Sequence, residues 1–408
     1  MTGRDEQLAA LARLQLDWVI DPDDVWSPLT QHVSALHSGQ ARQVLDRFAQ
    51  TERTSTPLGV VLEGEKGVGK THMLRRLRED VQAGGGWFFL VKFLEGGEFW
   101  HSVLHGVVAG FHAGGSDQLT RLLHRLCDLA RVDDLTRMKL CGTIPVTRPG
   151  LDAVVDGLLD AAHEVAVTCE DTIRAPVLYR ARKLAGEAGR SYFAHDGEVD
   201  TEQRAAWGLR HGARPPQQIL GELFRILALT GPTLVAVDQL DSLMAQANAT
   251  GDGAGGLVGQ VADGLMELRG QTRRALVVVA CLPRTWQLIT TRAVSTAADR
   301  FTVTQLRGAL PSADIAADLV RLRLDSSYAV SWAISACSSS MSRTSSRRCR
   351  PERPAARSGS PASARPSMTS TSTSASCDPG SMVSRFSRRS IPAWAGGGPW
   401  PNRPRSRR

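Results

Sequence analysis

Short, dense apolar runs recur along the chain and alternate with stretches of helical periodicity. Five such runs are bounded by polar or glycine-rich segments, which is typical of buried strands between helices. They lie at Leu58–Leu62, Trp87–Phe93, Thr233–Asp238, Arg274–Leu282 and Phe301–Leu306. This alternation predicts an α/β protein built on a buried sheet.

Between these runs, apolar residues recur every three or four positions, as on one face of a helix. The helices expected on this basis cover residues 5–16, 33–48, 73–81, 97–112, 118–130, 151–165, 172–188, 217–229, 240–246, 258–268 and 312–324. A glycine-rich turn is expected at Gly251–Gly256, and Ser312 is the expected N-cap of the last helix. Residues 115–214 contain helical patterns and no strand-like run, which predicts a helical insertion between the second and third strands.

The segment Gly64–Thr71 carries the most specific chemical signal. It reads GEKGVGKT and fits G-x-x-x-x-G-K-[ST] at every fixed position, between a strand-like run and a helical stretch. Such a loop points successive backbone N–H groups at a phosphate, and the next helix adds its positive end. The alternative is a glycine-rich turn that binds nothing. The expected nucleotide-binding residues are Gly64, Glu65, Lys66, Gly67, Val68, Gly69, Lys70, Thr71 and His72.

Magnesium chemistry is expected at Thr71 and Asp238. The Thr71 hydroxyl is a typical Mg²⁺ ligand in such a loop, where Lys70 reaches the β- and γ-phosphates. Four apolar residues run directly into Asp238. A buried strand would therefore deliver this carboxylate to the sheet edge that also holds the loop, as ATP hydrolysis with Mg²⁺ requires.

The charge of the chain changes abruptly near residue 325. Residues 326–408 contain 14 Arg, one Asp and one Glu, a net of +12, so residues 1–325 carry 8 − 12 = −4. This tail is made of Ser, Arg, Pro, Ala and Gly and cannot bury enough apolar surface to fold. It is either a basic disordered arm or the product of translation out of frame. The second is favoured, because Arg exceeds Lys 44 to 5, which suggests a GC-rich gene.

The cysteines and the apolar runs bear on the compartment. Seven cysteines are scattered without any C-x-x-C pair, so neither a metal site nor a disulfide framework is expected. No apolar run approaches the length of a membrane span, and the N-terminus does not look like a leader. We therefore expect a cytoplasmic protein with no membrane association. The expected domains are an N-terminal helical segment (1–50), a nucleotide-binding domain (51–325, insertion about 115–214) and the tail (326–408).

Taken together, these residues resemble the AAA+ and STAND branches of the P-loop ATPases, especially the origin-recognition-complex-like group. The resemblance covers roughly residues 35–324, and only the loop is specific. It implies a three-layer domain with a parallel five-stranded sheet of order 5-1-4-3-2, ATP bound at its C-terminal edge, a helical lid and possible homo-oligomers. Relatives of this kind usually continue into further domains, where this chain has the tail.

Two arginines gain roles through the resemblance. Arg284 follows the fourth strand and is expected to sense the γ-phosphate, although it could equally cap a helix or face water. Arg300 precedes the fifth strand and is expected to act as an arginine finger on a neighbouring subunit. A surface salt bridge is the alternative for Arg300.

One departure from the family pattern concerns hydrolysis. The position after Asp238 usually carries an acidic residue that activates water, and here it is Gln239, which cannot accept a proton. Asp241 or Glu95 could supply the base instead. ATP binding is therefore better supported than fast turnover.

Three functions follow from these observations. The first is an ATPase that acts as a motor or switch in DNA transactions, regulation or defence, with DNA or a protein as partner. The second is a nucleotide-binding scaffold without significant turnover. The third, if the tail is out of frame, is a truncated and inactive gene product.

Overall fold

The computed structural model describes residues 22–29, 32–93, 98–115, 117–194, 201–210, 212, 214–241, 254–292, 297–310, 312–322 and 324. The expected helix at 5–16, most of that at 240–246, Glu95 and the tail lie outside these residues. The chain divides into two compact units, Met1–Thr344 and Ser345–Arg408, and all described residues belong to the first.

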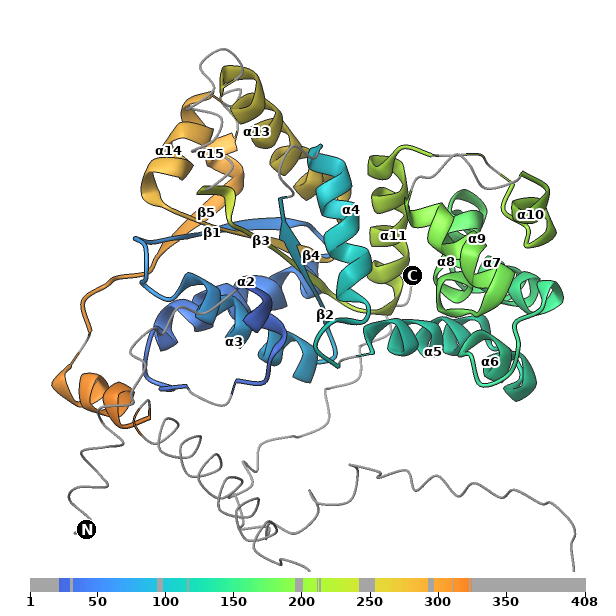
Figure 1. Ribbon diagram of the computed structural model, residues 1–408, viewed down its shortest axis with the longest axis horizontal. Helices are drawn as coiled ribbons and strands as arrows, with labels where there is room; N and C mark the ends of the chain where they lie inside the picture. The colour runs from blue at the N-terminus through green and yellow to red at the C-terminus, as the bar shows by residue number, and fades with distance from the viewer. Residues whose placement is uncertain are drawn as a thin grey trace, which may run out of the picture. The chain divides into compact units, whose positions relative to one another are not determined.

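Five parallel strands form one sheet (Figure 1). They are β1 (Leu58–Glu63), β2 (Trp87–Lys92), β3 (Thr233–Asp238), β4 (Ala275–Cys281) and β5 (Phe301–Gln305). The order is β2-β3-β4-β1-β5, which reads 5-1-4-3-2 from the β5 edge. In the register of the central strands, Val61 lies opposite Val279 of β4 and Val303 of β5. Because all strands are parallel, their carboxyl ends meet at a single edge.

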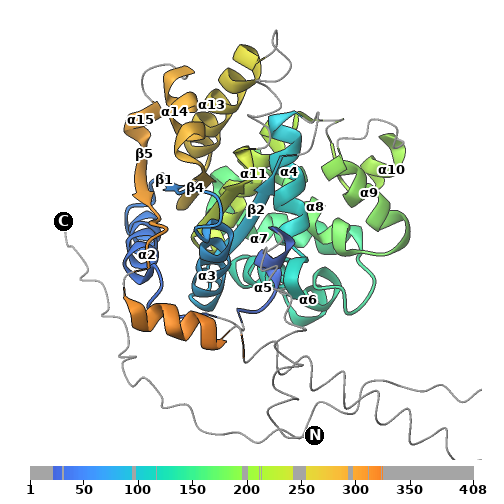
Figure 2. The same cartoon turned by 60° about the vertical axis from the view of Figure 1, so that its left-hand side comes forward.

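Alternate residues of the inner strands are buried on opposite faces of the sheet, which produces three layers. Val60, Phe88 and Val278 pack with α2 (Ser38–Thr54) and α3 (Lys70–Ala83). The other face carries Val61, Phe89 and Val279, and it is covered by the helices α4 (Phe99–Gly110), α11 (Pro216–Thr230), α13 (Ala254–Gln271) and α14 (Pro283–Arg292) (Figure 2). The runs are apolar throughout because both faces are covered.

The segment between β2 and β3 is helical, as expected. After α4 it contains α5 (Gln118–Ala130), α6 (Asp134–Leu140), α7 (Arg148–Thr168), α8 (Glu170–Arg180), α9 (Lys183–Ala194), α10 (Thr201–Ala206) and the short η2 (Ala113–Gly115). Asp117 caps α5 by accepting the N–H of Thr120. The remaining short elements are η1 (Pro22–Trp26) and α15 (Ala297–Arg300). In the described ranges, no helix combines the length and the apolarity that crossing a membrane requires.

Several elements differ from their sequence prediction. The single helix expected at 172–188 is divided, because the backbone of Ala181 is extended (ψ 165°) and Lys183 is left-handed (φ 57°). The turn expected at Gly251–Gly256 is helical from Ala254, since α13 buries an apolar face that outweighs the low helix propensity of its glycines. The helices α6 and α14 were not predicted, although Pro283 is a typical first residue of a helix.

Helix α4 approaches the sheet closely at Gly106. A Cβ built there would lie 2.7 Å from the carbonyl oxygen of Leu90 and 3.0 Å from the Cα of Val91, both on β2. We expect Gly106→Ala to lower the free energy of unfolding by about 1–3 kcal/mol, because the backbone of β2 cannot move aside. Urea denaturation would measure this.

Gly259 in α13 is the matched control, because a Cβ there meets no atom within 4 Å. Gly259→Ala should be neutral or stabilising by up to about 1 kcal/mol, through helix propensity alone. Equal effects of the two substitutions would contradict the close approach of α4 to β2.

Candidate functional site

The loop from Gly64 to Gly69 joins β1 to α3 and depends on its glycines in two ways. Gly67 and Gly69 adopt left-handed φ values of 81° and 98°, which favour glycine. A Cβ on Gly64 would lie 2.6 Å from the Cγ1 of Val68, so the loop closes on itself only with glycine there. The first loop residue is fixed to the sheet, since the Gly64 N–H donates to the carbonyl of Cys281 at 3.2 Å.

Lys70 is the first residue of α3, and its ammonium lies inside the loop. Its Nζ donates to the carbonyl oxygens of Gly64 at 2.7 Å and Glu65 at 3.2 Å. An ammonium has three donors, so one remains for an anion that enters the loop. Because α3 begins here, the N–H groups of its first turn have no partner within the helix and point the same way. These are the donors that a phosphate needs.

Asp238 ends β3 beside the loop and is 5% exposed. The Thr71 hydroxyl donates to its Oδ2 at 3.2 Å, and the Gln239 N–H donates to its Oδ1 at 2.9 Å. Burial raises the pKa of Asp238, and these two hydrogen bonds and the Lys70 ammonium oppose the rise. A cation beside this carboxylate would stabilise its charged form. Thr71 and Asp238 thus bring together two hard oxygen ligands, the type that Mg²⁺ prefers.

Within the described ranges, no group of three His, Cys, Asp or Glu side chains could hold a metal ion by itself. Mg²⁺ usually keeps several waters and binds through one or two carboxylates together with phosphate oxygens. The pair Thr71 and Asp238 fits that mode, because it leaves most coordination positions to water and to a nucleotide.

Asp241 and Glu95 are the two residues considered for activating water, and Glu95 lies outside the described residues. Gln239 is exposed and has a left-handed φ of 65°. Asp241 accepts, through Oδ1, the Leu282 N–H at 2.9 Å and the Thr285 hydroxyl at 2.5 Å. Its carboxylate therefore joins the start of α14 to the end of β3.

The two candidate arginines lie at opposite ends of the parallel strands. Arg284 is exposed in the first turn of α14, three residues after Cys281, which holds Gly64. Arg300 is exposed at the end of α15, directly before β5 and so at the amino-terminal edge. A five-residue strand spans about 17 Å, so Arg300 does not reach the loop of its own chain. Among the described residues, neither arginine makes an ion pair, so the surface salt bridge considered for Arg300 is not found.

A cavity of about 440 Å³ opens directly beside the loop. We call it the loop pocket. Its polar wall is the loop itself with His37 and His72, and its apolar wall comes from the segment before α2, the chain after β5 and the helical residues 313–322. The apolar residues are Val33, Leu36, Val68, Leu310, Leu319 and Leu322. Ser312 caps the last helix, as expected, through its hydroxyl and the Ile315 N–H.

The sequence interpretation missed this pocket, because Val33 and Leu36 were assigned to a packing helix that begins only at Ser38. The segment before that helix instead lies along α3. Arg75 donates to the Ser27 carbonyl, Arg78 to those of Trp26 and Ser27, and Arg76 to those of Ser34 and Leu36. The sequence feature connected with this contact is the run RRLR at residues 75–78. One of its arginines, Arg78, is only 5% exposed in the folded chain although it is charged.

Two histidines lie where this segment meets α3. The rings of His32 and His72 are 5.1 Å apart, and neither ring nitrogen of His32 has a hydrogen-bond partner in the described chain. Burial, followed by the charge of Arg76, lowers the pKa of His32 to about 4. Between about pH 6.5 and pH 4, the unfolded chain therefore binds a proton at His32 and the folded chain does not. The free energy of unfolding consequently decreases as the pH falls through this window.

We expect His32→Leu to remove part of this pH dependence. Between pH 7 and pH 4.5, the Tm of the wild type should fall further than that of the variant. His163→Leu, at an exposed position of α7, is the control and should follow the wild type. If the Tm of wild type and of His32→Leu fell in parallel with pH, His32 would not be a source of the pH dependence.

Comparisons with known proteins gave no match. No family model, no curated protein and no solved structure is similar to this chain. The functional reading of the site therefore depends on the positions and chemistry of its own residues.

Proposed function

We propose that this chain is an ATP-binding P-loop ATPase of the AAA+/STAND kind, in which ATP binding and slow hydrolysis drive a conformational change. The observation that carries the proposal is the convergence of three groups at one sheet edge. These are the Lys70 ammonium inside a glycine loop, the first turn of α3, and the hydrogen-bonded pair of Thr71 and Asp238. Either the loop or the buried carboxylate alone would be weaker support.

The residues divide the work of binding a nucleotide. The loop N–H groups and Lys70 would hold the phosphates, and Lys70 would exchange a loop carbonyl for a phosphate oxygen. Thr71 and Asp238 would hold Mg²⁺, which neutralises charge on the phosphates when it is bound. The loop pocket would take the base, because its lining combines the glycine loop with an apolar wall. Residues 313–322, which line that wall, would form the beginning of a lid.

Slow turnover fits the groups around Asp238. Gln239 cannot accept a proton, and Asp241 already accepts two hydrogen bonds from the start of α14. The same observations favour the second candidate, a nucleotide-dependent scaffold that binds ATP without turning it over. DNA or a protein partner is compatible with either function. The net charge of −4 in residues 1–325 favours a protein over extended contact with DNA.

Substitution of Lys70 is the direct test. Hydrogen bonds to charged groups are worth about 1.5–3 kcal/mol each, so we expect Lys70→Ala to weaken ATP binding by about 100-fold or more. Arg53→Ala is the control, because Arg53 is exposed in the last turn of α2 and lines neither the loop nor the loop pocket. Binding would be measured by calorimetry on the full chain with Mg²⁺, and turnover by phosphate release with and without double-stranded DNA. Unchanged ATP affinity in Lys70→Ala would reject the phosphate loop.

A role for Arg300 in a neighbouring subunit predicts complementation. Arg300→Ala and Lys70→Ala should each lose turnover, and a mixture of the two should regain part of it, because an intact loop can then meet an intact arginine. Arg190→Ala serves as the control at another exposed arginine, on α9 and outside both pockets, and should keep wild-type turnover. A mixture no more active than its components would argue against a shared site.

A further inference from the structure

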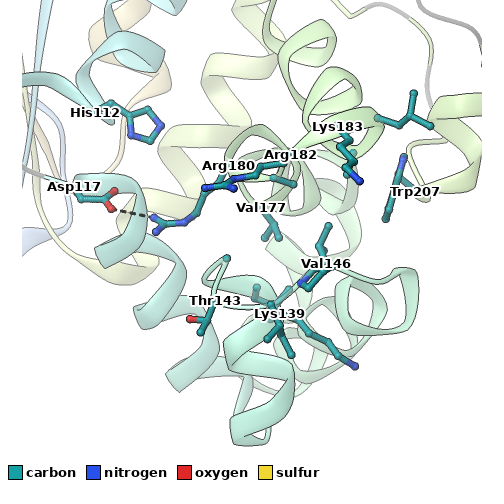
Figure 3. A pocket seen from close by; sticks show the side chains of 17 residues that line it. His112, Asp117, Lys139, Thr143, Val146, Val177, Arg180, Arg182, Lys183 and Trp207 are labelled. Atoms are coloured by element: carbon teal, nitrogen blue, oxygen red, sulfur yellow. Dashed lines mark hydrogen bonds and ion pairs between the residues drawn. The ribbon is translucent and has the colours of Figure 1, made fainter. Parts of the chain in front are cut away.

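A second cavity, of about 860 Å³, lies within the helical insertion (Figure 3). We call it the insertion pocket. It is bounded by the end of α6, the turn after it, the junction between α8 and α9, and the residue after α10. It shares no lining residue with the loop pocket. Its volume falls in the range of about 300–1,000 Å³ that is usual for small-molecule sites.

Cationic side chains dominate the polar part of this pocket. It is lined by Lys139, Arg180, Arg182 and Lys183 and by a single carboxylate, Asp117. Asp117 is already paired with Arg180 at 3.0 Å. In the part of the chain that the structure describes, the other three cations make no ion pair. The pocket therefore has an excess of positive charge that an anionic ligand would compensate.

The rest of the lining is apolar and includes an indole ring. Ile144, Val146 and Val177 contribute aliphatic surface, and Leu184 is 58% exposed although it borders the pocket. Trp207 is half-buried and lies at the same end of Figure 3 as Lys183. A ring platform beside cations suits a ligand that is flat on one side and charged at one end.

Packing and backbone conformation position two of the cationic residues, Arg180 and Lys183. A Cβ on Gly142, whose φ is 79°, would lie 2.8 Å from the Nε of Arg180, so the turn after α6 packs directly on that guanidinium. The turn is itself fixed, since the Thr143 N–H donates to the Met138 carbonyl at 2.9 Å. Lys183 has a left-handed backbone, which is unfavourable for a non-glycine residue and occurs preferentially at functional sites.

We propose that the insertion pocket binds a small aromatic anion, with its charged group on the cationic part of the lining, beside Lys183, and its ring on the surface that includes Trp207. This site is separate from the ATP site and does not depend on the proposed function. The charged group can be a phosphate or a carboxylate, since both are recognised by the same cations.

The test uses 1-anilinonaphthalene-8-sulfonate, a flat and fluorescent anion, and the full-length chain. We expect saturable binding that protects Lys139 and Lys183, but not Lys66, from acetylation as measured by mass spectrometry. The double variant Lys139→Gln/Lys183→Gln should bind the probe at least about tenfold more weakly, whereas Arg53→Gln, on the exposed face of α2, should match the wild type. Lys70→Ala should also bind normally, which separates this site from the phosphate loop.

Competition then assigns the charged group. Displacement of the probe by adenosine monophosphate points to a phosphate, and displacement by 4-hydroxybenzoate points to a carboxylate. Displacement by neutral adenosine at the same concentration as by its monophosphate would overturn the requirement for an anion. Equal acetylation of Lys139 and Lys183 with and without the probe would overturn the site itself, and this readout needs no variant to fold.

Discussion

The pairing of β1 with β4 is the interaction on which the candidate site depends. It aligns Glu63 with Cys281, and the Gly64 N–H then bonds to the carbonyl of Cys281. Because β4 also pairs with β3, Asp238 comes to the same edge although it lies 167 residues from Thr71 in the chain. The glycine loop, the carboxylate and the turn that bears Arg284 are thus brought together by buried strands, and the hydrogen bond from Thr71 to Asp238 then joins the helix after the loop to the carboxylate.

The sequence predicted the parts of the site that local patterns encode. Lys70 and Thr71 belong to a contiguous motif, and Asp238 follows an apolar run that is buried on both sides. The loop pocket could not be predicted in this way, because its walls come from segments before α2 and after β5 that meet only in the folded chain. The break between α8 and α9 was missed for a related reason, since no proline or glycine marks Ala181.

The helical insertion and the sheet share one apolar core. A single apolar core continues from Phe89 and Val235 on the sheet, through α4 and α11, to Leu178 and Tyr192 in the insertion. It also encloses polar groups that are fully paired, such as Glu222, which binds Arg214 and Thr172. Buried networks of this kind favour one packing arrangement over others. The insertion and the sheet that carries the glycine loop therefore belong to the same packed unit.

The strand order also determines when the glycine loop can take its shape. β1 is an inner strand, yet Leu58 pairs with Leu276 of β4, which lies 276 − 58 = 218 residues further along the chain. At about 5–20 residues per second, a ribosome needs roughly 10–40 s to add that length of chain. Until then, the apolar strand that carries the loop has neither of its neighbours. The glycine loop therefore emerges early in synthesis and becomes ordered among the last elements.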